Sequence, residues 1–195
     1  CIMISHSDAD HINAIVELID MTCDTFSIKK IVLPDIKAKL SDKAYCELVK
    51  KATKQGIDVE YISAGDIIFN GNIVKEINDI NKLKANNKDT IIECIHPTPQ
   101  YDYSCANDYS AVYMVTYNKF KTLMTGDIQE AAEKYIINNQ ALSEISVLKT
   151  AHHGSSTSSN EEFLNIIKPK VAIISCGINN RYHHPSQKII ERFKA

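Results

Sequence analysis

The chain has 195 residues, of which 44% are hydrophobic and 24% are charged, and its formal net charge is −2. This composition is close to the globular average and excludes long disorder and a fibrous chain, and the charge excludes a strongly basic nucleic-acid-binding coat. None of the six cysteines forms a CxxC pair, so the sequence has neither a zinc ribbon nor a thioredoxin-type motif.

Short β-branched runs alternate with longer amphipathic stretches in the first half of the chain. In chain order they predict a strand over 2–5, a helix over 11–21, a strand over 28–33 stopped by Pro34, a long helix over 36–55, a strand over 57–62 and a hairpin over 65–74. The next stretch, 77–89, is rich in Lys and Asn, and we expect an exposed connection there.

The second half repeats this alternation of strands and helices. It predicts a strand over 90–95, a hairpin over 110–117 and 120–125, a helix over 129–138, a strand over 145–150, a helix over 160–167, a strand over 171–175 and a helix over 185–193 with Pro185 in its first turn. No internal repeat, long linker or apolar run of the roughly 18 residues that cross a bilayer interrupts the pattern. We therefore expect one layered α/β (α+β) domain over residues 1–195.

Ligand-type side chains gather directly after the first predicted strand. His6, Asp8 and Asp10 alternate, so in an extended chain they point to one side, and His11 begins the next helix. This spacing can aim four metal-ligating side chains into one small volume. The competing explanation is that Asp10 is only the N-cap of that helix, but capping needs one such residue and not four.

A carboxylate also follows the strand over 120–125. Gly126 lets the backbone turn there, and Asp127 is then placed where its carboxylate can bridge two cations. The competing explanation is again a helix cap, since Asp127 and Glu130 fit a capping-box-like pattern.

Histidines follow the strand over 145–150. His152 and His153 precede Gly154 and a Ser-rich loop, and Arg181 and His184 supply a cation and a further imidazole before the last helix. Adjacent loop histidines are usually surface residues, but their place at a strand end makes them candidate ligands.

Together these segments resemble the metallo-β-lactamase fold superfamily, whose signature is H-x-H-x-D-H, a later His, a Gly-Asp pair and a final His. More narrowly, the chain is similar to the metallo-β-lactamase-type domain of ComEC-type DNA-uptake competence proteins and their stand-alone relatives. The similarity lies in Ser-His-x-Asp-Ala-Asp-His at the start, in the segments 107–110, 123–127 and 152–155, and in His184-Pro185. It runs from the first residues to about residue 192 and implies an αββα sandwich.

The resemblance also implies roles for individual side chains. The implied metal ligands are His6, Asp8, Asp10, His11, Asp127 and His153. Asp10, His152 and His184 are expected to take part in catalysis, and Asn107 and Ser110 to bind substrate. From their own chemistry we also expect Ser155 and Arg181 to bind substrate, through phosphate oxygens and the leaving group, although the Ser-rich loop could equally be a plain flexible loop. His153 matches the final His because it precedes Gly154, although the reverse assignment with His152 stays open.

The implied chemistry is metal-assisted hydrolysis. Two divalent cations roughly 3.5–4 Å apart would activate a water between them and neutralise charge on the bond to be cleaved. Asp8 replaces a second His of the usual signature, which favours manganese or magnesium, with zinc still possible. Because harder ions suit phosphoryl oxygen, we expect a phosphodiesterase or nuclease acting on DNA. The alternatives are hydrolysis of a small ester, lactone or amide, and a non-catalytic module that binds a metal or a partner.

One feature departs from the superfamily. In the superfamily, the first strands of the fold precede the first ligand motif, whereas in this sequence few residues precede His6, where that motif begins. We therefore expect a sandwich that lacks its N-terminal strands and exposes a sheet edge and an apolar face. The expected location is cytoplasmic for a stand-alone chain, or membrane-associated for a fragment of a longer ComEC-type protein.

Overall fold

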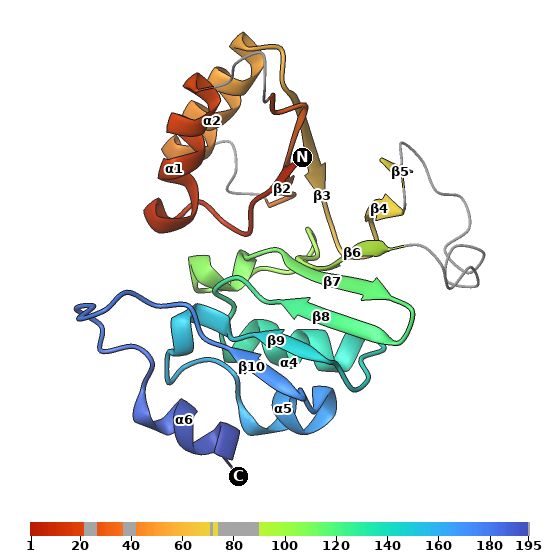
Figure 1. Cartoon of the computed structure of the whole chain (residues 1–195), viewed down its shortest axis with the longest axis vertical. Helices are drawn as coiled ribbons and strands as arrows, with labels where there is room; N and C mark the ends of the chain where they lie inside the picture. Colours follow the sequence, from red (N-terminus) through yellow and green to blue (C-terminus); the bar gives the residue numbers. More distant parts are fainter. Residues whose placement is uncertain (22–26, 37–41, 71, 74–89, 195) are drawn as a thin grey trace.

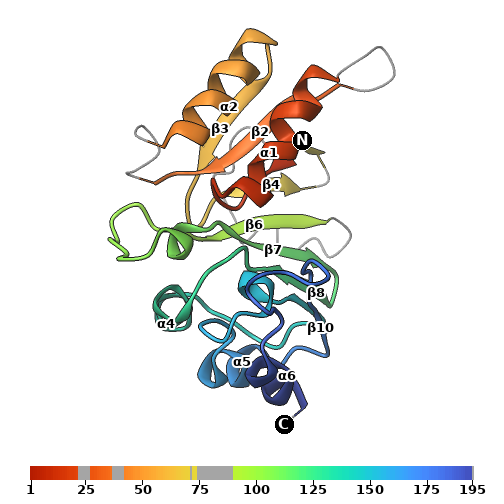
Figure 2. The ribbon, with the colours of Figure 1, turned by 90° about the vertical axis from the view of Figure 1, so that its left-hand side faces the viewer.

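A computed structural model describes residues 1–21, 27–36, 42–70, 72–73 and 90–194. In this part of the chain two β-sheets lie face to face, with helices on both outer sides (Figure 1). The first sheet is parallel and has the order β1-β2-β3, formed by β1 (Ile2–Met3), β2 (Lys30–Pro34) and β3 (Asp58–Ile62). Helices α1 (Ala9–Asp20) and α2 (Lys43–Lys54) cover its outer face (Figure 2).

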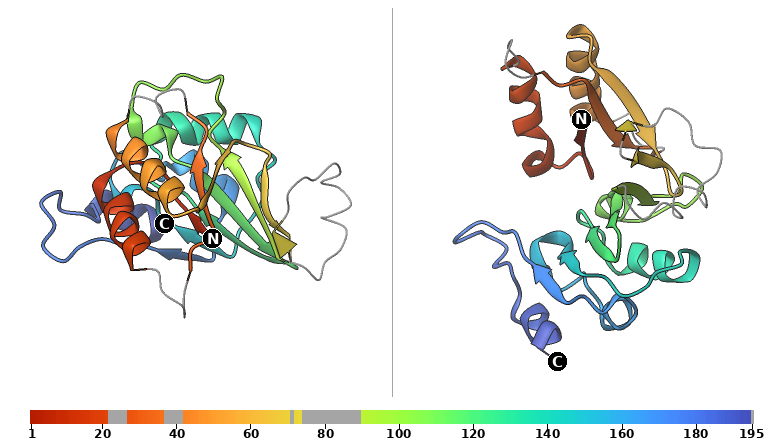
Figure 3. Two further views of the ribbon diagram at one scale, coloured as in Figure 1. Left: turned by 90° about the horizontal axis from the view of Figure 1, so that it is seen from above. Right: turned by 45° about the vertical axis from the view of Figure 1, so that its right-hand side comes forward.

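The second sheet has the order β10-β9-β8-β7-β6-β4-β5. Its strands are β4 (Ile67–Asn70), β5 (Asn72–Ile73), β6 (Ile91–His96), β7 (Val112–Tyr117), β8 (Phe120–Met124), β9 (Val147–Lys149) and β10 (Val171–Ile173). Strands β8, β9 and β10 are parallel, and the other pairs are antiparallel. Helices α4 (Glu130–Asn139), α5 (Glu161–Ile167) and α6 (Gln187–Lys194) lie on the side away from the first sheet (Figure 3).

Three apolar clusters hold these layers together. One fills the space between the first sheet and α1 and α2, and another fills the space between the second sheet and α4 and α5. The third joins the sheets, where Val32 and Ile62 of the first meet Cys94 and Tyr113 of the second. The layers therefore run helix, sheet, sheet, helix, which confirms the expected αββα sandwich.

The first sheet covers only part of the second. Tyr113 of β7 packs in the cluster between the sheets, and its partner across the ladder, Met124 of β8, is 41% exposed. Further along the same face, Val171 and Ile173 of β10 are each 52% exposed. The sequence analysis predicted an exposed apolar face without placing it, and the described residues show exposed apolar side chains over β8 and β10. Among these residues no helix is both long and apolar enough to cross a membrane.

Helix α2 corrects the sequence prediction at its start. The Asp42 carboxylate accepts hydrogen bonds from the backbone N–H groups of Ala44 and Tyr45, so the helix begins at Lys43 and not at residue 36. Ile36 is not helical, and 37–41 lie outside the described residues. Ser7 also donates to Asp42, which ties the first ligand segment to this helix.

Two prolines also differ from expectation. Pro34 lies within β2 as its last residue, whereas the sequence predicted that the strand would end before it. The proline lacks a backbone N–H, but β1 ends before it could pair with Pro34, so no hydrogen bond to β1 is lost. Pro185 precedes α6 instead of lying in its first turn, since the helix begins at Gln187. The two hairpins are confirmed. The predicted connection over 77–89 lies outside the described residues.

Candidate metal centre

Strand ends from both sheets converge at one edge of the sandwich. His6 follows β1, Asp127 follows β8, and His153 lies in the short 3₁₀ segment η3 (Ala151–Gly154) after β9. Backbone hydrogen bonds join these segments. Ala111 donates to the Ser5 carbonyl over 2.7 Å, and the N–H of η3 residue 152 donates to the carbonyl of residue 126 over 3.1 Å. Residues far apart in the sequence are thereby fixed side by side.

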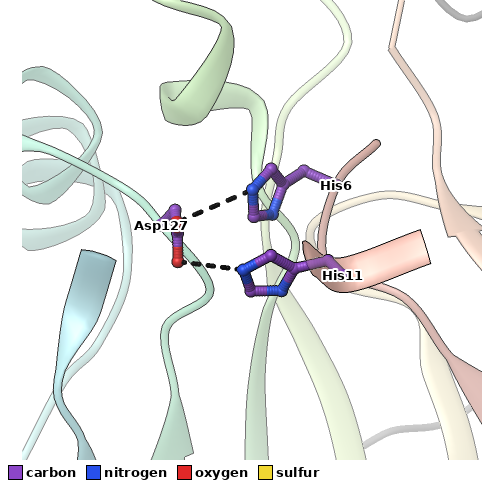
Figure 4. A group of neighbouring side chains, drawn as sticks. All are labelled: His6, His11 and Asp127. Carbon is purple, nitrogen blue, oxygen red and sulfur yellow. Dashed lines mark ion pairs between the residues drawn. The ribbon is translucent and has the colours of Figure 1, made fainter. Parts of the chain in front are cut away.

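His6, His11 and Asp127 form a first group (Figure 4). His6 Nε2 lies 3.7 Å from Asp127 Oδ2, and His11 Nε2 lies 3.5 Å from Asp127 Oδ1. Asp8 adds its Oδ2 at 3.7 Å from His6 Nε2. His6 and Asp127 are buried, whereas His11 is partly exposed, so the group opens toward solvent on the His11 side.

Asp10, His11 and His153 form a second group that shares His11 with the first. His153 Nε2 lies 3.2 Å from Asp10 Oδ2 and 3.2 Å from Asp127 Oδ2. The Nε2 atoms of His11 and His153 are 3.4 Å apart. The fold thus brings together all six side chains that the sequence predicted as metal ligands.

The chemistry of these atoms fits divalent cations. Within the described part of the chain, His6 Nε2 and Asp127 Oδ1 are buried without a hydrogen-bond partner. Leaving such atoms unpaired costs free energy, and a bound cation would satisfy both at once. Three imidazoles and three carboxylates are a donor set that first-row divalent metals accept.

The centre also sets the protonation of its members. Burial alone would raise the pKa of Asp127, but the imidazoles of His11, His6 and His153 around it lower that pKa to about 2. Burial and the neighbouring His11 lower the pKa of His6. Burial also acts to lower the pKa of His11, but Asp127 outweighs it and raises that pKa. Asp127 is therefore ionised at neutral pH.

A hydrogen bond at the ring nitrogen that faces away from the ligand groups fixes the orientation of His153. Its Nδ1 donates to the Ser175 carbonyl over 2.8 Å, because a carbonyl oxygen can only accept. This hydrogen bond selects the tautomer whose Nε2 lone pair faces the centre. His152 lies outside both ligand groups, with its Nε2 3.3 Å from Asn107 Nδ2 and its ring 5.7 Å from that of His184. Of the two adjacent histidines, the structure brings His153 into the cluster.

The residues predicted to bind substrate differ in their exposure to solvent: Ser110 and Ser155 are buried, and Arg181 is exposed. Ser110 is fully buried, and its hydroxyl accepts the Asp127 backbone N–H over 3.1 Å. The Ser155 hydroxyl is buried beside Thr157. Arg181 is exposed, with its guanidinium 4.6 Å from the centre of the Tyr182 ring. Their substrate contacts remain predictions.

The capping explanations considered for the two aspartates are wrong. The N-cap of α1 is Asp8, which makes no side-chain capping bond, and Asp10 lies within the first turn. Helix α4 begins at Glu130, and Asp108 rather than Asp127 accepts from its start, with Oδ1 accepting from the N–H of Gln129 over 2.7 Å and from the N–H of residue 132 over 3.3 Å.

Sequence reasoning did not find the roles of two residues, Asp108 and Ser5. Asp108 lies in the Asn-Asp-Tyr-Ser segment, residues 107–110, on which the family resemblance partly rests. Its membership of that segment was the available signal for its role. The Ser5 hydroxyl contacts two of the histidines, and its position directly before the first ligand was the corresponding signal.

Comparison with known proteins finds a family and several relatives. A family model described as the metallo-beta-lactamase superfamily matches residues 1–178. ComE operon protein 3 of Bacillus subtilis is 29% identical over 190 residues, which are 97% of this chain and 21% of that protein. Recombination protein 2 of Haemophilus influenzae is 40% identical over 86 residues, or 44% of this chain and 11% of that protein. Competence protein ComA of Neisseria gonorrhoeae is 36% identical over 90 residues, which are 46% of this chain and 13% of that protein. The chain thus spans 21% or less of the length of these relatives.

Proposed function

The chain belongs to the metallo-β-lactamase superfamily, and we propose that it is a metal-dependent hydrolase that cleaves phosphodiester bonds in DNA. The observation that carries the proposal is the position of Asp127. This buried, ionised carboxylate lies within 3.7 Å of the Nε2 atoms of three histidines, and one of its oxygens has no hydrogen-bond partner in the described structure. Such an arrangement is stable when a cation lies between these atoms.

Two cation positions are proposed from the two ligand groups. His6, Asp8 and Asp127 would hold one, Asp10 and His153 would hold the other, and the remaining member, His11, lies between them. Cations bound there would supply a Lewis acid and a hydroxide-like nucleophile near neutral pH.

The chain's own residues would orient the substrate. Asp10 and His153 reach the solvent side of the centre, where a phosphate could approach. His184 lies beside His152, and burial lowers the pKa of His184, so its imidazole is neutral at pH 7 and can accept a proton. Arg181 is exposed and bears the charge that would attract a phosphodiester.

DNA is proposed as the substrate on two grounds. Three carboxylates in the donor set make it harder than an all-histidine site, and hard cations such as Mn²⁺ and Mg²⁺ prefer phosphoryl oxygen. The names of two relatives refer to recombination and competence, which supports a DNA substrate for this chain and a role in DNA uptake.

The test is cleavage by the purified 195-residue chain. Single- and double-stranded DNA and a chromogenic lactone are incubated with Mn²⁺, Mg²⁺ or Zn²⁺, using wild type, Asp127→Asn and the control Asp58→Asn. Asp58 is an exposed carboxylate on β3, so the control makes the same chemical change away from the centre.

The proposal predicts metal-dependent DNA cleavage that Asp127→Asn abolishes and Asp58→Asn retains. Turnover of the lactone without DNA cleavage would instead support a small-molecule hydrolase. Bound metal without turnover of either substrate would support a non-catalytic module and overturn the proposal.

A further inference from the structure

One hydroxyl group contacts two of the candidate ligand histidines at Nδ1, the ring nitrogen that faces away from Asp127. Ser5 Oγ lies 3.0 Å from His6 Nδ1 and 3.3 Å from His11 Nδ1. The opposite ring nitrogens, both Nε2, face Asp127 at 3.7 and 3.5 Å. The two rings are close, with centroids 4.1 Å apart and planes tilted by 46°.

We propose that Ser5 is a positioning residue whose single oxygen accepts the Nδ1–H of both His6 and His11. A hydroxyl oxygen has two lone pairs and can accept two such bonds. A neutral imidazole that donates from Nδ1 keeps its lone pair on Nε2, the atom that must be free to bind a cation. Ser5 thereby selects the ligand tautomer of two histidines at once. The inference rests on the proposed metal-binding function.

Ser5 is itself held firmly in place. Its carbonyl accepts the Ala111 N–H over 2.7 Å, and the preceding carbonyl, of Ile4, accepts the Tyr113 hydroxyl over 2.9 Å. A Cβ on Gly126 would lie only 2.9 Å from Ser5 Cβ, so the backbone of the Asp127 segment packs directly on this side chain. The hydroxyl is therefore fixed relative to both sheets rather than free to follow the rings.

A purely space-filling role for Ser5 predicts a different response to substitution. If only its volume mattered, Ser5→Cys would behave as wild type, because the thiol has nearly the same shape. If acceptance of two N–H groups matters, Ser5→Cys and Ser5→Ala both fail, because sulfur is a weak acceptor and alanine has none. Ser7→Ala is the matched control, since the neighbouring Ser7 hydroxyl donates to Asp42 and makes no hydrogen bond to a histidine in the described structure.

The first measurement is made on metal-free protein. Long-range ¹H–¹⁵N spectra at about pH 9, where imidazoles are neutral, report which nitrogen of each ring carries the proton. In the metal-free protein the ionised Asp127 carboxylate competes for these protons, because its oxygens lie 3.7 and 3.5 Å from the two Nε2 atoms. We therefore expect a larger share of the Nδ1–H form for His6 and His11 in wild type and Ser7→Ala than in Ser5→Cys and Ser5→Ala. Because no metal is present, this readout tests Ser5 even if the proposed hydrolase function fails.

The second measurement is Mn²⁺ affinity by calorimetry. Loss of such an outer hydrogen bond to a metal ligand typically weakens binding by about 10–100-fold, and we expect this range for Ser5→Ala and Ser5→Cys but no change for Ser7→Ala. Unchanged tautomers together with affinity within about twofold of wild type would overturn the proposal. An equal loss in Ser7→Ala would overturn it as well. If Ser5→Ala does not fold, the nearly isosteric Ser5→Cys alone decides.

Discussion

Gly126 precedes Asp127 and packs against Ser5 and Ser110, and its replacement by alanine can be treated quantitatively. Its φ is +54°, a left-handed conformation that costs an L-residue roughly 1–2 kcal/mol. An added Cβ would lie 2.8 Å from Ser110 Cβ, 2.9 Å from Ser5 Cβ and 3.3 Å from the Ala111 carbonyl oxygen. Overpacking of this kind costs roughly 1–3 kcal/mol. We therefore expect Gly126→Ala to lower the free energy of unfolding by about 2–5 kcal/mol.

Gly56 provides the control for the part of this cost that comes from the left-handed backbone conformation. It has a similar φ of +68°, but an added Cβ would meet no atom within 4 Å, so Gly56→Ala should cost only the conformational roughly 1–2 kcal/mol. Urea unfolding of both variants in a metal chelator measures the two costs, and their difference isolates the packing term. If Gly126→Ala destabilises the chain no more than Gly56→Ala does, the described packing of Ser5 and Ser110 against this turn is incorrect.

Three further predictions concern the surroundings of the centre. Burial lowers the pKa of His96 to about 4, so its imidazole is protonated in the unfolded chain before the folded one, and His96 lowers the free energy of unfolding as the pH drops from about 6.5 to 4; urea unfolding across this range should show a loss that is about 3 kcal/mol smaller in His96→Gln than in wild type. Asp108→Ala removes the acceptor for the first turn of α4 and should cost about 1–3 kcal/mol of unfolding free energy in the same assay, whereas Asp108→Asn should recover part of it. By calorimetry, His153→Ala should weaken Mn²⁺ binding at least about tenfold and His152→Ala by less than about threefold, and the reverse order would exchange their roles.

Features set by neighbouring residues in the sequence were predictable. The β7–β8 hairpin followed from its β-branched strands around Asn118-Lys119, and the ligand segments followed from polar residues placed directly after apolar strands. The resemblance then connected these segments, because spacing alone does not say that Asp127 lies beside His6.

Features that depend on partners far along the chain were not predictable. Ser175 follows β10, and nothing in its local sequence shows that its carbonyl holds His153. Pro34 is tolerated only because the neighbouring strand β1 ends early. Asp42 is different, since an Asp before a helical stretch is a recognised N-cap signal and would have given the correct start of α2.

The central claim is that the two ligand groups that meet around Asp127 and His11 bind divalent cations. Crystals of the 195-residue chain grown with Mn²⁺ test it directly through the anomalous scattering of the ion. The account predicts one peak within bonding distance of His6 Nε2 and a carboxylate oxygen of Asp127, and a second within bonding distance of His153 Nε2 and a carboxylate oxygen of Asp10. A fully loaded crystal whose only peaks lie away from these atoms would contradict it.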